Sequence, residues 1–151
     1  MRRFWLTCVS FAIIGIIFFL DQFTKTIMFA SDHAPSFSFF GGWIKSVQHR
    51  NAGIIANIAL PSSLILSISL MVILLLVIGI ILSIRQSHQF SLIIASLILG
   101  GALGNTFDRL ILSYVRDWLL LFNRSAINLA DVSIVIGILL YFLYTAKKTA
   151  N

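Results

Sequence analysis

The sequence predicts an integral membrane protein with an all-α core of four transmembrane helices and a small extracytoplasmic β-sheet that forms a cradle. The first observation behind this prediction is composition. Hydrophobic residues make up 59% of the 151 residues and charged residues only 11%, whereas a typical soluble protein has about 25% charged residues. So few charges could not cover the surface of a soluble fold, so lipid must cover most of it. The length suits one domain, expected over residues 1–151.

The second observation is the presence of four long apolar stretches. A helix needs about 20 apolar residues to cross the hydrocarbon core of a bilayer. We expect spans at 4–29, 62–84, 90–108 and 131–147. The third stretch is rich in glycine and alanine, which let helix backbones approach closely inside a membrane.

The third observation concerns the two segments that separate the first span from the second and the third from the fourth. The earlier segment contains Pro35, Gly41 and Gly42 among aromatic residues, and the later one contains the strand-like run 112–118. These patterns favour short strands and turns resting on the membrane surface.

Charge distribution predicts the orientation. Four spans place both termini on one side, and all the acids then lie on the other side. The side of the termini carries five cations and no acid: Arg2, Arg3, Arg85, Lys147 and Lys148. The positive-inside rule counts cations in short flanks, so we expect cytoplasmic termini. The net charge of +6 is spread thinly, which favours contact with anionic lipid head groups and argues against a nucleic-acid partner.

The acids are unusual because there is no glutamate and each aspartate lies at a distinctive place. The five are Asp21, Asp32, Asp108, Asp117 and Asp131. Ionisable residues at the ends of membrane helices are costly, so they are candidates for function.

Two short motifs contain the first polar candidates. In Asp21-x-x-Thr24-Lys25, the acid and the base are four residues apart on one helical face and can pair. Taken alone, this pattern favours an ion pair that eases burial at a helix end. In Asn51-Ala52-Gly53, the glycine permits a tight turn or a close backbone approach, and a plain turn explains it equally well.

Two further motifs flank the last outer segment. Asn105, Asp108 and Arg109 follow a glycine-rich run and share one helical face. A helix-packing motif explains the glycines well and the three polar residues less well. In Asn128-Leu129-Ala130-Asp131, the asparagine and the acid resemble a helix cap, and capping is as good an explanation of Asp131 as catalysis.

Asp117 and Asp131 are two carboxylates that could meet at the outer membrane boundary. Two close carboxylates share a proton, so one can activate a water while the other protonates a carbonyl oxygen. This is aspartyl protease chemistry, which needs no metal or cofactor. Other chemistries lack their motifs, since His33, His49 and His88 are scattered and no HExxH, GxSxG or Walker sequence occurs.

Taken together, the motifs resemble the lipoprotein signal peptidase family, also called signal peptidase II. The resemblance extends from the first span to the last. The matching elements are Asp21-x-x-Thr24-Lys25, Asn51-x-Gly53, Gly101-x-x-Gly104-Asn105-x-x-Asp108-Arg109, Val115-x-Asp117 and Asn128-x-Ala130-Asp131.

The resemblance implies four transmembrane helices with a small sheet that cradles the substrate. It implies an aspartyl endopeptidase that cleaves diacylglyceryl-modified prolipoproteins just before the lipidated cysteine. The catalytic pair falls on Asp117 and Asp131. Supporting and substrate-binding roles fall on Asp21, Lys25, Asn51, Gly53, Asn105, Asp108, Arg109, Asn128 and Ala130. The expected setting is the bacterial inner membrane, with prolipoproteins and membrane lipids as partners, a monomeric enzyme and the site at the extracytoplasmic face.

This chain departs from the family's usual pattern at several places, including Trp118, where phenylalanine is usual, and a shorter stretch between Asp117 and Asp131. Ile54-Ile55-Ala56-Asn57 follows Gly53, where an alanine, an aromatic and a small polar residue are usual. Arg116 stands at a position that is usually apolar. Because side chains alternate along a strand, we expect Arg116 to point away from the face of Asp117; a guanidinium on that face would lower the carboxyl pKa.

A rival interpretation from another class is a non-catalytic membrane protein, such as a lipoprotein-binding or accessory subunit. It explains the apolar helices, the glycines and the altered loop after Gly53. It does not explain both candidate carboxylates, because a binding protein needs neither.

Overall fold

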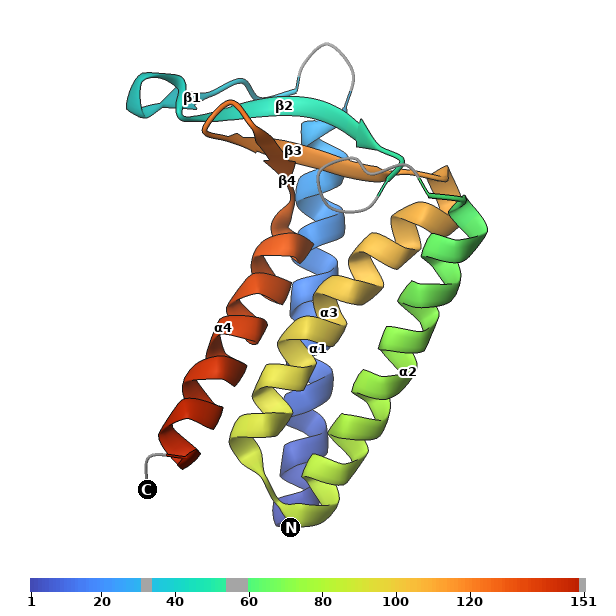
Figure 1. The fold of residues 1–151 in the computed structure, drawn as a ribbon, viewed down its shortest axis with the longest axis vertical. Coiled ribbons are helices and arrows are strands. Elements are labelled where there is room, and N and C mark those ends of the chain that lie inside the picture. Colours follow the sequence, from blue (N-terminus) through green and yellow to red (C-terminus); the bar gives the residue numbers. More distant parts are fainter. Residues whose placement is uncertain (31–33, 54–59, 150–151) are drawn as a thin grey trace.

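The computed structural model describes residues 1–30, 34–53 and 60–149. Over these residues, four long helices stand side by side, and a four-stranded antiparallel sheet lies across one end of them (Figure 1). The helices are α1 (Arg2–Met28), α2 (Ser62–Gln86), α3 (Gln89–Leu112) and α4 (Leu129–Thr149). The strands are β1 (Ser38–Phe39), β2 (Ile44–Asn51), β3 (Val115–Leu121) and β4 (Ser125–Ile127), and the 3-10 helix η2 (Phe40–Gly42) follows β1.

Each long helix is long and apolar enough to cross a membrane, so the predicted class of a membrane all-α core with a small sheet is confirmed. The helix ends differ from the predicted 4–29, 62–84, 90–108 and 131–147 by a few residues. The largest difference is in α3, which continues past Asp108 to Leu112, a stretch without glycine or proline, and ends at Ser113 with a φ of 66°. Residues 54–57, where the unusual loop was noted, lie outside the described residues.

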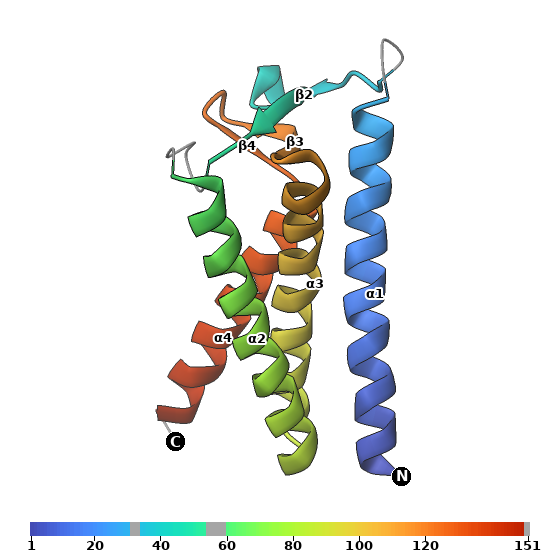
Figure 2. The same ribbon diagram turned by 90° about the vertical axis from the view of Figure 1, so that its right-hand side faces the viewer.

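Helix α3 is the centre of the bundle. It packs against α1, α2 and α4, and Figure 2 shows it between α1 on one side and α2 and α4 on the other. Half of its most apolar window is buried, against 11–17% for the other three helices. Those helices turn large side chains such as Phe11, Leu74 and Leu143 outward, which suits a hydrocarbon solvent and not water.

Two glycines of α3 allow its close approach to the neighbouring helices. A Cβ atom at Gly101 would lie 2.5 Å from the backbone oxygen of Ala130 in α4. A Cβ atom at Gly104 would collide with the carboxylate of Asp21 in α1. Only the absence of a side chain permits these contacts, which place polar residues of α1, α3 and α4 next to one another.

The sheet has the order β1-β2-β3-β4, with neighbouring strands antiparallel. In the register between β2 and β3, Asn51 lies opposite Val115, and His49 lies opposite Asp117. Both chain termini lie at the end of the bundle remote from the sheet (Figure 1). The aspartate-bearing ends of α1, α3 and α4 therefore gather under the sheet, away from the cationic termini.

The contact at Gly101 yields a testable prediction. We expect Gly101→Ala to lower the free energy of unfolding by about 1–3 kcal/mol, because the added methyl group meets backbone that cannot move aside. The matched control is Gly79→Ala in α2, where an added Cβ meets nothing within 4 Å. The control should be neutral or slightly stabilising. Thermal unfolding in detergent measures both variants, and equal melting temperatures would contradict this packing.

Candidate active site

The carboxylate of Asp117 is held by two asparagine side chains. It projects from β3 and is only 1% exposed. The Nδ2 atom of Asn51, the last residue of β2, donates to Oδ2 at 3.0 Å. The Nδ2 atom of Asn128, which immediately precedes α4, donates to Oδ1 at 2.6 Å. Both carboxylate oxygens therefore accept a hydrogen bond from a neutral donor.

Asp131 lies in the first turn of α4 and is held in a similar way. Asn105 of α3 donates through Nδ2 to its Oδ1 at 2.7 Å. The backbone N–H of Asn128 donates to Oδ2 at 3.2 Å, and the backbone N–H of Asp131 donates back to Oδ1 of Asn128 at 3.0 Å. This reciprocal pattern is a capping box. The carboxylate of Asp131 therefore caps α4 and is also the second candidate catalytic group.

Asn128 and Asn105 join the two carboxylates into one network. The Nδ2 atom of Asn128 donates both to Asp117 and, at 3.1 Å, to Oδ1 of Asn105. That Oδ1 also accepts a hydrogen bond from Lys25 Nζ at 3.0 Å. With its oxygen committed to these two donors, the amide of Asn105 must present its nitrogen to Asp131.

The electrostatics of Asp117 differ from those of an exposed aspartate. Burial raises the pKa of Asp117 from 3.8 to about 6. The negative charge of Asp131 adds to the rise, while hydrogen bonds from Asn51 and Asn128 oppose it. The raised pKa of Asp117 therefore has two causes, burial and the nearby charge of Asp131.

A separate cluster of charges lies beside this network. Lys25 Nζ is 2.7 Å from Asp21 Oδ2 and 3.3 Å from Asp108 Oδ2, and all three side chains are 0% exposed. Arg116 of β3 completes the cluster, with its NH2 atom 2.8 Å from Asp108 Oδ1. Asp21 also accepts a hydrogen bond from the backbone N–H of Ala130 at 2.9 Å. We call Asp21, Lys25, Asp108 and Arg116 the ion cluster.

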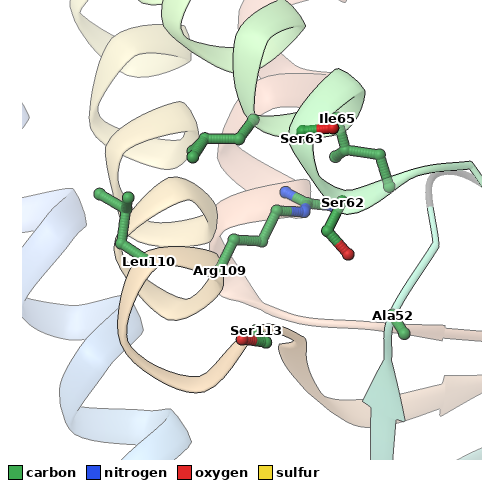
Figure 3. A pocket seen from close by; sticks show the side chains of 8 residues that line it. Ala52, Ser62, Ser63, Ile65, Arg109, Leu110 and Ser113 are labelled. Atoms are coloured by element: carbon green, nitrogen blue, oxygen red, sulfur yellow. The ribbon is translucent and has the colours of Figure 1, made fainter.

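Arg109 lies on the side of the site that faces α2. Its NH2 atom donates to the backbone oxygen of Gly53 at 3.2 Å, and the N–H of Gly53 donates to Oδ1 of Asn51 at 3.0 Å. Figure 3 shows its guanidinium next to Ser62 in a cavity between α2, α3 and the end of β2. The cavity measures about 220 Å³ and is also lined by Ser63 and Ser113.

The structure therefore brings the sequence candidates together in three adjoining groups. Asn51, Asn105 and Asn128 contact the two candidate catalytic carboxylates. Asp21, Lys25, Asp108 and Ala130 form or touch the ion cluster, and Arg109 with Gly53 borders the cavity. Among the described side chains, no group of three or more His, Cys, Asp or Glu residues could hold a metal ion.

Sequence reasoning missed the contribution of Gln22. Its Nε2 atom lies within hydrogen-bond distance of Asp21 Oδ2, the backbone oxygen of Gly104 and Asp108 Oδ1, at 3.1, 3.1 and 3.3 Å. Its Oε1 atom accepts from Arg116 at 2.8 Å. A polar amide near the end of an apolar span was the available signal. The predicted direction of Arg116 is confirmed, since its contacts are with Asp108 and Gln22 and not with Asp117.

The arrangement of Asp117 and Asp131 suits proton transfer. Among the described residues neither carboxylate takes part in a salt bridge, and two carboxyl groups joined through amides can hold one proton between them. The ion cluster pairs Lys25 and Arg116 with Asp21 and Asp108. A water placed between the carboxylates could then be deprotonated by one of them while the other donates a proton.

Comparisons with known proteins show the family to which the chain belongs. A family model described as signal peptidase (SPase) II matches residues 13–147. The lipoprotein signal peptidases of Staphylococcus aureus strains JH9 and Newman are each 28% identical to this chain over 150 residues, covering 96% of this chain and 91% of the relative.

Two solved structures, both described as bacterial membrane enzymes studied by the in meso method, have a similar fold. The first aligns with a TM-score of 0.82 at 26% identity and covers 95% of this chain and 90% of its own. The second aligns with a TM-score of 0.71 at 25% identity, covering 91% and 92%. Because the family match spans nearly the whole chain and the fold agrees, this multi-pass bacterial membrane protein is a peptidase that belongs to the signal peptidase II family.

Proposed function

We propose that this chain removes the signal peptide from diacylglyceryl-modified prolipoproteins. It cleaves the bond just before the lipidated cysteine, using Asp117 and Asp131 as an aspartyl pair. The names of the Staphylococcus aureus relatives support the substrate class, and the geometry of the two carboxylates supports the mechanism.

The observation that carries the proposal is that the aspartates of the site fall into two groups with different partners. Asp21 and Asp108 are paired with Lys25 and Arg116, so their charges are satisfied within the ion cluster. Among the described residues, Asp117 and Asp131 take part in no salt bridge, and neutral asparagines bridge them. A carboxylate without a cationic partner is free to exchange a proton at ordinary pH.

In the proposed mechanism, the ionised carboxylate of the pair accepts a proton from a water, which attacks the scissile carbonyl, while the other carboxyl, which is protonated, donates its proton to the carbonyl oxygen. When the C–N bond breaks, the first carboxyl gives the water-derived proton to the leaving amine, and the second recovers its proton from the hydroxyl as the carbonyl re-forms. Asn51, Asn105 and Asn128 orient the two carboxylates, because each donates to one of them. Arg109 faces the cavity and provides donors for the substrate backbone near the lipidated cysteine.

The proposed placement in the membrane follows from the same geometry. The ends of the bundle differ, with cationic termini at one and the sheet and aspartates at the other. Termini in the cytoplasm place the carboxylate pair at the extracytoplasmic face. A lipid-modified substrate then reaches the site sideways from the bilayer, and the monomer contains all the residues that the mechanism uses.

The first prediction concerns the two carboxylates. We expect Asp117→Asn and Asp131→Asn each to lower cleavage by about 10³-fold or more, because neither general base nor general acid can be replaced by an amide. The measurement is a gel-shift assay in detergent with a diacylglyceryl-modified prolipoprotein. The matched control is Asp32→Asn, the one aspartate outside the five motifs, which should retain wild-type activity.

Two outcomes decide between the interpretations. Full activity in either Asp117→Asn or Asp131→Asn would remove the aspartyl mechanism. A folded wild-type protein that binds the lipid-modified prolipoprotein without cleaving it would instead establish the non-catalytic lipoprotein-binding protein.

The second prediction concerns pH. Because the pKa of Asp117 is raised to about 6, the pair loses its shared proton as the pH rises through that value. We expect kcat/KM to fall above about pH 6, and a profile that stays flat from pH 5 to 8 would contradict a shared proton. The folded state binds more protons than the unfolded state between pH 3.8 and about 6, so this carboxyl lowers the stability as the pH rises through that window.

A further inference from the structure

Arg116, a residue of β3, makes four hydrogen bonds to two side chains of the helices. Its backbone N–H donates to Oδ2 of Asp108 at 3.0 Å, and its Nε atom donates to the same oxygen at 3.3 Å. Its NH2 atom donates to Asp108 Oδ1 and to Gln22 Oε1, both at 2.8 Å. The side chain is 15% exposed in this ion pair. One residue of β3 is thus fastened both to α3 and to α1.

These contacts fix Arg116, which immediately precedes Asp117 in β3. Successive side chains of a strand point to opposite faces, and the contacts of the two residues follow that rule. Arg116 contacts Asp108 and Gln22, whereas Asp117 contacts Asn51 and Asn128. Because the two share no hydrogen-bond partner, the shortest connection from the guanidinium to Asp117 is the backbone between them, and a longer one runs through Asp108, Lys25, Asn105 and Asn128.

Among the described residues of β3, Arg116 alone is hydrogen-bonded or ion-paired to α1 and α3. The register between β2 and β3 shifts between Ser46 and His49, so ladder pairing is irregular just beside Asp117. The ladder resumes at the pairs His49–Asp117 and Arg50–Arg116. A strand with an irregular ladder needs a second constraint to fix the position of a side chain within a fraction of an ångström.

We propose that Arg116 is a positioning residue, which clamps β3 onto Asp108 and Gln22 so that Asp117 is held in catalytic register with Asp131. This inference rests on the proposed function, because it assigns a role in that same reaction. The clamp depends on the planar fork of the guanidinium, which donates to both oxygens of one carboxylate and to the amide at the same time. An ammonium group of lysine has the charge and lacks the fork.

The clamp also completes the charge balance of the ion cluster, so stability and positioning must be separated by experiment. Arg116→Gln leaves Asp108 with Lys25 as its remaining ion-pair partner. The double variant Asp108→Asn with Arg116→Gln returns the cluster to neutrality and keeps an oxygen that can accept the backbone N–H of residue 116. The double variant therefore restores charge without restoring the fork.

The test measures kcat and KM for a diacylglyceryl-modified prolipoprotein with the full-length protein in detergent, together with Tm. We expect Arg116→Lys and Arg116→Gln to lower kcat on the order of 10-fold or more, since small displacements of reacting groups are costly, and to leave KM within about twofold. In the double variant, Tm should recover toward the wild type while kcat stays low.

Arg50→Gln is the matched control. Arg50 occupies the same rung of the sheet as Arg116 and precedes Asn51 as Arg116 precedes Asp117. It is exposed and lies over the ring of Tyr114, 5.4 Å from its centroid. This variant should keep the wild-type kcat.

Three outcomes would overturn the inference while the wild type still cleaves. They are an unchanged kcat in both single variants, a kcat that recovers together with Tm in the double variant, and a raised KM at unchanged kcat. The second would assign Arg116 to stability alone, and the third would assign it to substrate contact. Absence of cleavage by the folded wild type would instead overturn the proposed function, and this role with it.

Discussion

The structure depends on the mutual neutralisation of four charges, three of which are fully buried. Transfer of a single ion from water into a medium of low dielectric costs many kcal/mol, and a nearby opposite charge offsets that cost only when the geometry is good. In the ion cluster, the charges of Asp21, Lys25, Asp108 and Arg116 alternate in sign along the chain of contacts. Asp21 and Lys25 come from α1, Asp108 comes from α3, and Arg116 comes from the sheet. The ion pair between Arg116 and Asp108 therefore attaches the sheet to the helix bundle.

Helix packing makes this cluster possible. Gly104 leaves room for the carboxylate of Asp21 against the backbone of α3, and Gly101 lets the first turn of α4 approach the same helix. Ala130 is fully buried at this point, and its N–H donates to Asp21. The glycines thus act through shape, since they bring three helix ends near enough for short polar side chains to meet. In a hydrocarbon solvent, close packing of this kind replaces the hydrophobic driving force.

The environment of the candidate catalytic pair, Asp117 and Asp131, depends on the neighbouring ion cluster. Lys25 contacts both cluster aspartates and also the oxygen of Asn105, whose nitrogen then donates to Asp131. The lysine thereby orients an amide toward the pair without placing a positive charge directly on it. Asp117 keeps neutral donors and a raised pKa. Asp108 and Asp117 are the same residue type, yet their electrostatic surroundings differ, because Asp108 has ion-pair partners and Asp117 has amide donors.

The sequence by itself determined the class of the protein, since a bilayer requires about 20 apolar residues per span and four such stretches are visible in one dimension. It also determined the candidate residues, because the motifs containing Asp117 and Asp131 lie in the order that the family shares. The pair Asp21–Lys25 is visible in the sequence, because the two residues are one helical turn apart. Only the tertiary structure decided which groups of different elements pair. Asp131 meets Asn105 across 26 positions, and Arg116 meets Gln22 across 94. No local periodicity encodes such distant contacts, because they depend on how three helices and a sheet share the space around one set of charges.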